Sequence, residues 1–246
     1  MQLTPHQQCF FADFGYLILP GLMADDIDWI TEEFERTFCE AGLVHDGTQR
    51  TSLHQCMDRN ERLCTLLDDS RIEGALAGVL GEDFNYLGSG GEYYVGGGLW
   101  HPDCGAKPML FVKLAMYLDP LTKDTGALRL VPGSHRQGRQ GNLDTQALWG
   151  LDPEQVPCVA PDNQPGDVVI FNLNTFHNSL GGGPRRRMFN MVCCAHCQTP
   201  EQLAELDRNV VPAKGQMYGE VLRRTATPQR QRHLRQVLER EALLAA

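Results

Sequence analysis

Hydrophobic residues in the first 82 positions follow helical spacing. Ile27, Ile30, Phe34 and Phe38 recur every three or four residues, which is typical of an amphipathic helix. A Thr-Pro pair at positions 4 and 5 is a typical helix start, and glycine often follows a helix end. The pattern therefore predicts a helix from this pair to Gly15, a strand at 16–20, and helices over 24–42 and 70–81.

From residue 84 the pattern changes to short apolar runs that are separated by Gly, Pro and Asp. Many short strands with such connections predict a sandwich or a barrel. The runs are "FNYLG" at 84–88, "GEYYVG" at 91–96, "MLFVKLAMYLDP" at 109–120, "GALRLVPGS" at 126–134, "GDVVIFNLNTFHNS" at 166–179 and "RRMFNMVCCAH" at 186–196.

The remaining segments complete the predicted organisation. Residues 43–66 are polar and irregular, and the long polar interval 137–165 predicts a surface loop or lid. The charged, amphipathic residues 228–246 predict a final helix. We expect residues 1–246 to form one mainly β domain with flanking helices: a helical cap over 1–82, a core over 83–198 and a helical extension over 199–246.

Composition narrows the classes of partner. The chain has 22 Lys and Arg against 31 Asp and Glu, a net charge of -9, so it offers no broad basic surface for nucleic acid or anionic lipid. No apolar run approaches the roughly 20 residues that span a bilayer, and the start of the chain does not resemble a secretory signal. We expect a small-molecule partner, no nucleic acid and no membrane.

Nine cysteines form an odd and irregular set, which predicts reduced thiols and a cytoplasmic protein. Cys193, Cys194 and Cys197 with His196 also suggest a zinc site. Because there is no second C-x-x-C pair and the cluster follows a strand, buried thiols are the favoured interpretation.

His101 and Asp103 in "GGGLWHPDCGAKP" are two positions apart, so in an extended chain their side chains point to the same face. His177, at the end of a strand-like run, supplies a third ligand. Two histidines and one carboxylate with open positions form the facial triad of non-haem Fe(II) oxygenases. A structural role for an isolated H-x-D remains the alternative.

A later arginine triplet completes the candidate chemistry. Planar guanidinium groups bind carboxylates through two hydrogen bonds, and "PRRRM" offers Arg185, Arg186 and Arg187. Strand alternation places Arg186 on one face and its two neighbours on the other, so one phase points inward. Lys113 and Tyr117 share a face of the apolar run 109–120. Lys113 either faces the cavity, where it would contact a cosubstrate or a substrate anion, or extends to solvent, and Tyr117 predicts a second contact to the cosubstrate.

Together these motifs resemble the phytanoyl-CoA dioxygenase family of Fe(II)- and 2-oxoglutarate-dependent oxygenases. The similarity covers about residues 3–192 and rests on "LTPHQQCFFADFGYLILPGLMADD", "WHPD", "YLDPLTKDTGALRLVPGSHR", "GDVVIFNLNTFHNS" and "RRRM". The resemblance implies a double-stranded β-helix, the jelly-roll or cupin-like core.

The resemblance also implies residue roles. His101, Asp103 and His177 would bind iron, and Arg186 with Ser179 would bind the distal carboxylate of 2-oxoglutarate. Family members with glycine in place of the aspartate bind chloride and halogenate, so Asp103 favours hydroxylation. The implied activity is hydroxylation of a C–H bond of a small metabolite by O2, with release of succinate and CO2.

Two alternatives stay open at this stage: a cupin-like metal enzyme that does not use 2-oxoglutarate, and a catalytically silent jelly-roll binding module. A zinc hydrolase is a more distant third, since the same ligands hold zinc. The sequence sets neither the substrate nor the oligomeric state. Candidate substrate contacts near the predicted mouth are Tyr94, Trp100, Arg129, His135 and Arg139.

Overall fold

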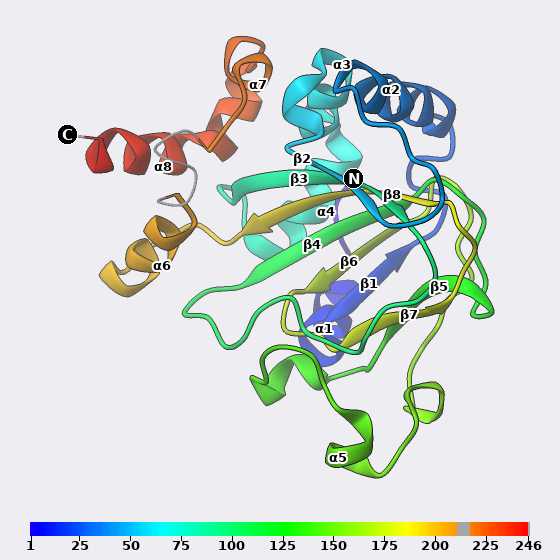
Figure 1. The fold of residues 1–246 in the computed structure, drawn as a ribbon. Coiled ribbons are helices and arrows are strands. Elements are labelled where there is room, and N and C mark those ends of the chain that lie inside the picture. The colour runs from blue at the N-terminus through cyan, green and yellow to red at the C-terminus, as the bar shows by residue number, and fades with distance from the viewer. Residues whose placement is uncertain (211–216, 246) are drawn as a thin grey trace.

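Two antiparallel sheets form the centre of the protein in the computed structural model, which describes residues 1–210 and 217–245 (Figure 1). The larger sheet has the strand order β1-β6-β4-β8-β3-β2, and the smaller sheet pairs β5 with β7. The strands are β1 (Tyr16–Leu19), β2 (Thr51–His54), β3 (Asn85–Tyr94), β4 (Phe111–Tyr117), β5 (Thr125–Leu130), β6 (Val168–Asn172), β7 (His177–Gly181) and β8 (Arg186–Cys194).

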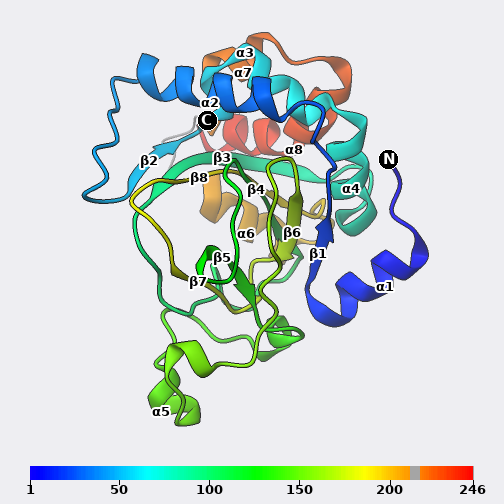
Figure 2. The same ribbon diagram turned by 90° about the vertical axis from the view of Figure 1, so that its right-hand side faces the viewer.

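Most of the helices lie on the face of the large sheet that points away from the β5–β7 pair, whereas α1 lies beside β1 and α5 lies on the side of the β5–β7 pair (Figures 1 and 2). None of the helices in the described part of the chain is both long and apolar enough to cross a membrane. The α-helices are α1 (Pro5–Phe14), α2 (Ile27–Glu40), α3 (Glu61–Cys64), α4 (Ser70–Leu80), α5 (Thr145–Trp149), α6 (Pro200–Val210), α7 (Glu220–Arg224) and α8 (Pro228–Leu244). Residues 211–216 and 246, which belong to the predicted C-terminal extension, lie outside the described residues.

The N-terminal helix begins and ends where the sequence predicts. The hydroxyl of Thr4 accepts a hydrogen bond from the backbone N–H of Gln7, whose side chain accepts one from the backbone of Thr4 in return. Gly15 ends the helix in the left-handed conformation, with φ of 81°. Only glycine adopts that conformation without steric cost, so the chain turns directly into β1.

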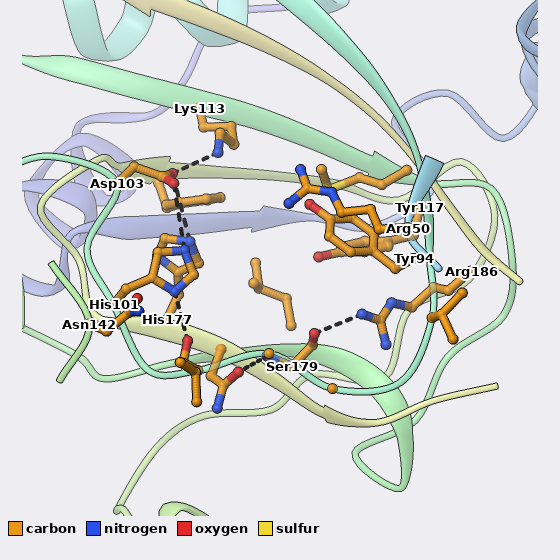
Figure 3. A pocket seen from close by; sticks show the side chains of 18 residues that line it. Arg50, Tyr94, His101, Asp103, Lys113, Tyr117, Asn142, His177, Ser179 and Arg186 are labelled. Carbon is orange, nitrogen blue, oxygen red and sulfur yellow. Dashed lines mark hydrogen bonds and ion pairs between the residues drawn. The ribbon is translucent and has the colours of Figure 1, made fainter. Parts of the chain in front are cut away.

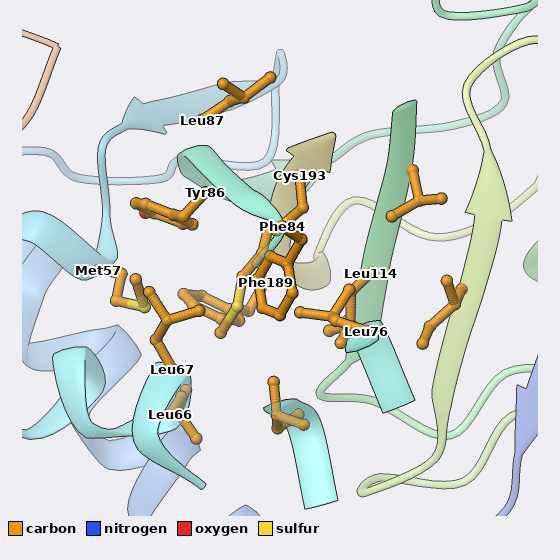
Figure 4. Close-up of a cluster of buried hydrophobic side chains, with 14 of the residues drawn as sticks. Met57, Leu66, Leu67, Leu76, Phe84, Tyr86, Leu87, Leu114, Phe189 and Cys193 are labelled. Atoms are coloured by element: carbon orange, nitrogen blue, oxygen red, sulfur yellow. The ribbon is translucent and has the colours of Figure 1, made fainter. Parts of the chain in front are cut away.

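A hydrophobic core joins the large sheet to the helices. Phe84, Phe189 and Leu114 from the strand region meet Met57 and Leu76 from the helical side, and all five are fully buried (Figure 4). Burying a large apolar side chain contributes about 1.5–3 kcal/mol. The helices thus fix one face of the sheet and leave the other face to form the site.

Isolated β-bridges extend the smaller sheet beyond β5 and β7. Isolated bridges add His101 on the side of His177 and Val159 on the side of Leu130. Two facing antiparallel sheets of this kind, with helices outside, form the jelly-roll core that the sequence predicts. That prediction of the fold class is confirmed.

The glycines at 88–91 predict a break between two strands, and this prediction is wrong. The structure has one continuous β3, with an irregular register only between Tyr86 and Gly88. A Cβ on Gly91 would lie 2.6 Å from the ring of Phe38. Gly91 therefore serves close packing of α2 against the sheet, and the turn interpretation fails there for that reason.

The run 166–179 shows the opposite difference: the pattern predicts one run, and the structure has two strands there, in two different sheets. The backbone N–H of Thr175 donates to the carbonyl of Asn172 at 2.8 Å, which makes a tight turn between β6 and β7. His177 therefore begins β7 and does not end β6. The apolar pattern misses the turn because residues on both sides of it are buried.

Segments that the pattern leaves irregular also carry structure. Residues 43–66 contain β2 and α3, and residues 137–165 contain α5. The first 82 residues contribute both edge strands of the large sheet, since β1 pairs with β6 and β2 pairs with β3. β1 is apolar and was predicted, whereas β2, with the sequence TSLH, is short and half-polar and lacks the pattern by which a strand is recognised.

Candidate metal centre and its pocket

His101 and His177 lie side by side because their backbones pair. Each donates its N–H to the carbonyl of the other, at 3.1 and 3.0 Å. Asp103 donates its N–H to the carbonyl of Leu173 at 2.8 Å, on the same neighbouring segment. The backbone nitrogen of Pro102 therefore faces the open edge, where a proline costs no ladder hydrogen bond.

The three predicted ligands converge on one point. Nε2 of His101 lies 3.8 Å from Oδ1 of Asp103, and Nε2 of His177 lies 3.6 Å from Oδ2. One ligand atom from each residue lies within 4.8 Å of the others. Within residues 1–210 and 217–245 this is the one set of three or more potential ligands, so Cys193, Cys194 and Cys197 do not form a second.

Backbone carbonyls orient both imidazole rings. Nδ1 of His101 contacts the carbonyl of Leu99 at 2.7 Å, and Nδ1 of His177 contacts the carbonyl of Thr175 at 2.9 Å. With Nδ1 protonated and bound in this way, Nε2 presents its lone pair toward Asp103. This is the arrangement that a metal-binding histidine requires.

The protonation states of His177 and Asp103 also favour the binding of a cation. Burial lowers the pKa of His177 to about 4, so its imidazole is neutral near neutral pH. Burial opposes ionisation of Asp103, but the positive charge of Lys113 outweighs it and holds the pKa of this carboxyl below its usual value. The cluster therefore presents the negative charge of Asp103 beside the neutral imidazole of His177.

The stability of the metal-free protein is expected to fall as the pH decreases from about 6.5 to about 4. His177 has a folded-state pKa near 4, below its usual 6.5, so in this window the unfolded chain binds the additional proton. The free energy of unfolding then decreases by up to about 3 kcal/mol. Urea denaturation at pH 7 and pH 4.5 measures the loss, which H177Q should reduce and a substitution at the exposed His54 should not.

Lys113 lines the cavity and does not extend to solvent. Its ammonium donates to Oδ2 of Asp103 at 2.7 Å, and its side chain is 18 % exposed. It also lies over the ring of Phe171, 5.8 Å from the centroid. The partner of Lys113 in this structure is therefore the candidate metal ligand.

The triad opens into a cavity of about 460 Å³ between the two sheets. His101, Asp103 and His177 lie toward one end, and Arg186 with Ser179 toward the other (Figure 3). Tyr117, buried on β4, lines the same cavity. Pockets of this volume suit small molecules.

The arginine triplet divides as strand alternation predicts. Arg186 is 3 % exposed and lines the cavity. Arg185 pairs with Glu35 at 2.6 Å, and Arg187 pairs with Asp119 and with Glu35 outside the cavity. Only the middle arginine of the three is free of an acidic partner and faces the pocket.

Arg186 is buried without a compensating charge. Nη2 donates to the hydroxyl of Ser179 at 2.8 Å, but Nε and Nη1 have no hydrogen-bond partner among the described residues. Cβ atoms on Gly126 and Gly182 would lie 2.0 and 2.4 Å from Nη1, so glycine at both positions makes room for the guanidinium. Burial lowers the pKa of Arg186, and unmet buried donors of this kind indicate an anion site.

The predicted substrate contacts are mostly wrong, since only Tyr94 lines the cavity. Trp100 is buried and donates to the carbonyl of Pro153, and Arg129 donates to the carbonyl of Lys123. His135 packs near α1, and Arg139 is exposed and does not line the pocket. These residues are near the site in sequence, but their strands and loops direct them elsewhere.

Two residues that line the cavity, Arg50 and Asn142, could not be recognised from the sequence. Arg50 precedes β2 in the segment that reads as irregular, and Asn142 lies in the predicted lid. Neither sits in a periodic pattern or a motif. Only the pairing of β2 with β3 brings Arg50 to the cavity.

Comparison with known proteins agrees with this geometry. The family model described as "Phytanoyl-CoA dioxygenase (PhyH)" matches residues 11–188. An ectoine dioxygenase from Sphingopyxis alaskensis is 22 % identical over 217 residues, which cover 73 % of this chain and 71 % of that protein.

Solved structures show the same fold. The EctD protein of S. alaskensis, solved with 2-oxoglutarate and 5-hydroxyectoine, superposes with a TM-score of 0.66 at 24 % identity, over 78 % of this chain and 76 % of that one. SnoK, a non-haem α-ketoglutarate-dependent carbocyclase from nogalamycin biosynthesis, gives 0.65 at 22 % identity, over 78 % and 84 %. With the family model spanning most of its length, this chain belongs to the phytanoyl-CoA dioxygenase family of Fe(II)- and 2-oxoglutarate-dependent oxygenases.

Proposed function

We propose that this protein hydroxylates a C–H bond of a small-molecule metabolite, using Fe(II), O2 and 2-oxoglutarate. One oxygen atom of O2 enters the new hydroxyl group, and the other enters succinate as 2-oxoglutarate loses CO2. The observation that carries the proposal is one cavity that combines a two-histidine, one-carboxylate cluster with an uncompensated buried arginine.

The donor set fits Fe(II). His101 and His177 would bind it through Nε2, and Asp103 through one carboxylate oxygen, which leaves positions open for a chelating cosubstrate and O2. The bound metal supplies the activation of O2. Lys113 holds Asp103 in place, so its contribution is to position the ligand and not to grip the cosubstrate.

The cosubstrate fits the opposite end. Arg186 and Ser179 bind the distal carboxylate of 2-oxoglutarate, which satisfies the donors that Arg186 leaves unmet in the protein alone. Tyr117 contributes a second contact from β4. The apolar side chains of Leu128, Phe171 and Met188 complete the walls and limit the access of water to the reacting groups.

Hydroxylation is the favoured outcome of the reaction. The name of SnoK, a carbocyclase, indicates that this fold also supports other oxidative outcomes. Asp103 occupies the third ligand position and points into the cluster, where a halide would otherwise bind. The rivals are a metal enzyme that does not use 2-oxoglutarate and a silent binding module.

Anaerobic addition of 2-oxoglutarate to the iron-loaded protein tests the proposal. We expect a visible charge-transfer band from bidentate chelation, and none when succinate, which lacks the 2-oxo group, replaces 2-oxoglutarate. Exposure to air should then release succinate from the 2-oxoglutarate sample. Iron retained without a band would overturn the proposal in favour of the first rival, and failure to retain iron would favour the second.

A further inference from the structure

Arg50 is a second arginine of the cavity, and a buried carboxylate fixes it from behind. Its Nε donates to Glu92 at 2.9 Å, and Ser52 donates to the same carboxylate. The side chain of Glu92 is only 6 % exposed, whereas that of Arg50 is 54 % exposed and lines the cavity. A buried anchor of this kind restricts the guanidinium to one orientation before any ligand binds.

An aromatic ring supports the flat face of the same group. The guanidinium of Arg50 lies over Tyr94, 4.6 Å from the ring centroid, and that of Arg186 lies 5.1 Å from the same centroid. In Figure 3 the terminal nitrogens of Arg50 extend into the pocket from the side of Tyr94. Within the described residues no acceptor binds them, so the planar donor fork is open to a ligand.

The proposed cosubstrate does not account for this fork. One end of 2-oxoglutarate chelates the metal and its distal carboxylate binds Arg186, so both of its anionic groups have partners. The formal charges of the metal, the cosubstrate and the charged side chains at the cavity sum to an excess of positive charge. Iron brings two positive charges, and Arg50, Lys113 and Arg186 bring one each, against one negative charge from Asp103, one from Glu92 and two from the cosubstrate. One positive charge remains, and a monoanion neutralises it.

We propose that Arg50 binds a carboxylate of the primary substrate, and that this protein therefore oxidises small carboxylic acids. The inference rests on the proposed function, because it depends on 2-oxoglutarate occupying the end at Arg186. A carboxylate matches the open fork through two parallel hydrogen bonds. The rest of the substrate then extends between Tyr94 and the triad, where its C–H bond reaches the metal end of the cavity.

Matched pairs of a free carboxylate and its primary amide test the inference. Hexanoate and hexanamide, phenylacetate and phenylacetamide, and N-acetyl amino acids and their amides differ in charge and in little else. Each compound is titrated against the anaerobic Fe(II)·2-oxoglutarate complex, with thermal stabilisation as the readout. We expect carboxylates to bind and amides to bind at least about tenfold more weakly.

The variant R50Q should lose this preference. We expect its affinity for the carboxylates to fall on the order of 10- to 100-fold, with the charge-transfer band and the affinity for 2-oxoglutarate unchanged. R36Q is the matched control, because Arg36 is 53 % exposed and pairs with the buried Glu33 outside the cavity. R50K keeps the charge without the fork and should give an intermediate loss, which provides a second test if R50Q does not fold.

Each other outcome overturns the inference. Equal binding of carboxylates and amides, or no binding of any carboxylate by the wild-type complex, excludes a carboxylate site. Loss of 2-oxoglutarate affinity in R50Q assigns Arg50 to the cosubstrate instead. An intact band with any of these results leaves the proposed function standing, whereas absence of the band in the wild type overturns both.

Discussion

Replacing Asp103 with alanine is expected to remove Fe(II) binding and turnover together. The change deletes the only carboxylate of the cluster and leaves the ammonium of Lys113, 2.7 Å away, without its partner. That positive charge then repels the metal from the two histidines. Loss of a residue that merely orients a ligand costs about 10- to 100-fold in metal affinity, so loss of the ligand itself should cost on the order of 100-fold or more.

Titration of Fe(II) under anaerobic conditions and succinate release in air measure the two losses. D207A is the matched control: Asp207 is 21 % exposed, like Asp103, and pairs with Arg240 on α8. It removes an ion pair of similar exposure at a distance from the cavity. Iron affinity in D103A equal to that of D207A would contradict the assignment of Asp103 as a ligand.

Short motifs in the sequence predicted several of the side chains that line the cavity. H-x-D after a glycine-rich segment, a later histidine and an arginine triplet are local patterns, and strand alternation alone separated Arg186 from its neighbours. The family and the jelly-roll core predicted from the same motifs are confirmed. The side chains of the motifs converge on one cavity because each lies on a face of a strand that local alternation sets.

Contacts between distant segments were not predictable in this way. Lys113 was recognised as a charge in an apolar strand, but its partner Asp103 emerges only when β4 faces the segment beside β7. Arg50 lies in a stretch with no periodicity, and its place depends on Glu92, 42 residues later in the chain. Local patterns carry no information on such pairings.

The role of individual glycines was also not predictable, because it depends on contacts with distant segments. Gly91 in β3 read as a turn signal, yet it lies in a paired strand against Phe38, and Gly126 and Gly182 make room for Arg186. A glycine that permits a close approach and a glycine that forms a turn look the same in sequence. The approaching group decides between them, and it comes from elsewhere in the chain.

Replacing Arg186 with methionine is expected to remove 2-oxoglutarate binding while making the metal-free protein more stable. Truncating one partner of a buried charge pair costs about 2–5 kcal/mol of binding, so affinity should fall on the order of 100-fold or more. The apoprotein behaves oppositely, since Arg186 is buried with one hydrogen bond, two unmet nitrogens and no acidic partner. An apolar side chain of similar length should raise the free energy of unfolding by about 1 kcal/mol.

The adjacent arginine provides the contrast that makes this result specific. R187M also replaces a largely buried arginine, but it leaves Asp119 without its ion-pair partner and Glu35 with Arg185 alone, so the free energy of unfolding should fall by about 2 kcal/mol with 2-oxoglutarate affinity unchanged. Urea denaturation of the metal-free variants and titration of the charge-transfer band separate the two properties. Destabilisation of R186M to the same extent as R187M would show that Arg186 supports the fold and not a ligand. The opposite signs, at consecutive positions of β8, follow from which of the two side chains has its charge compensated by the protein itself.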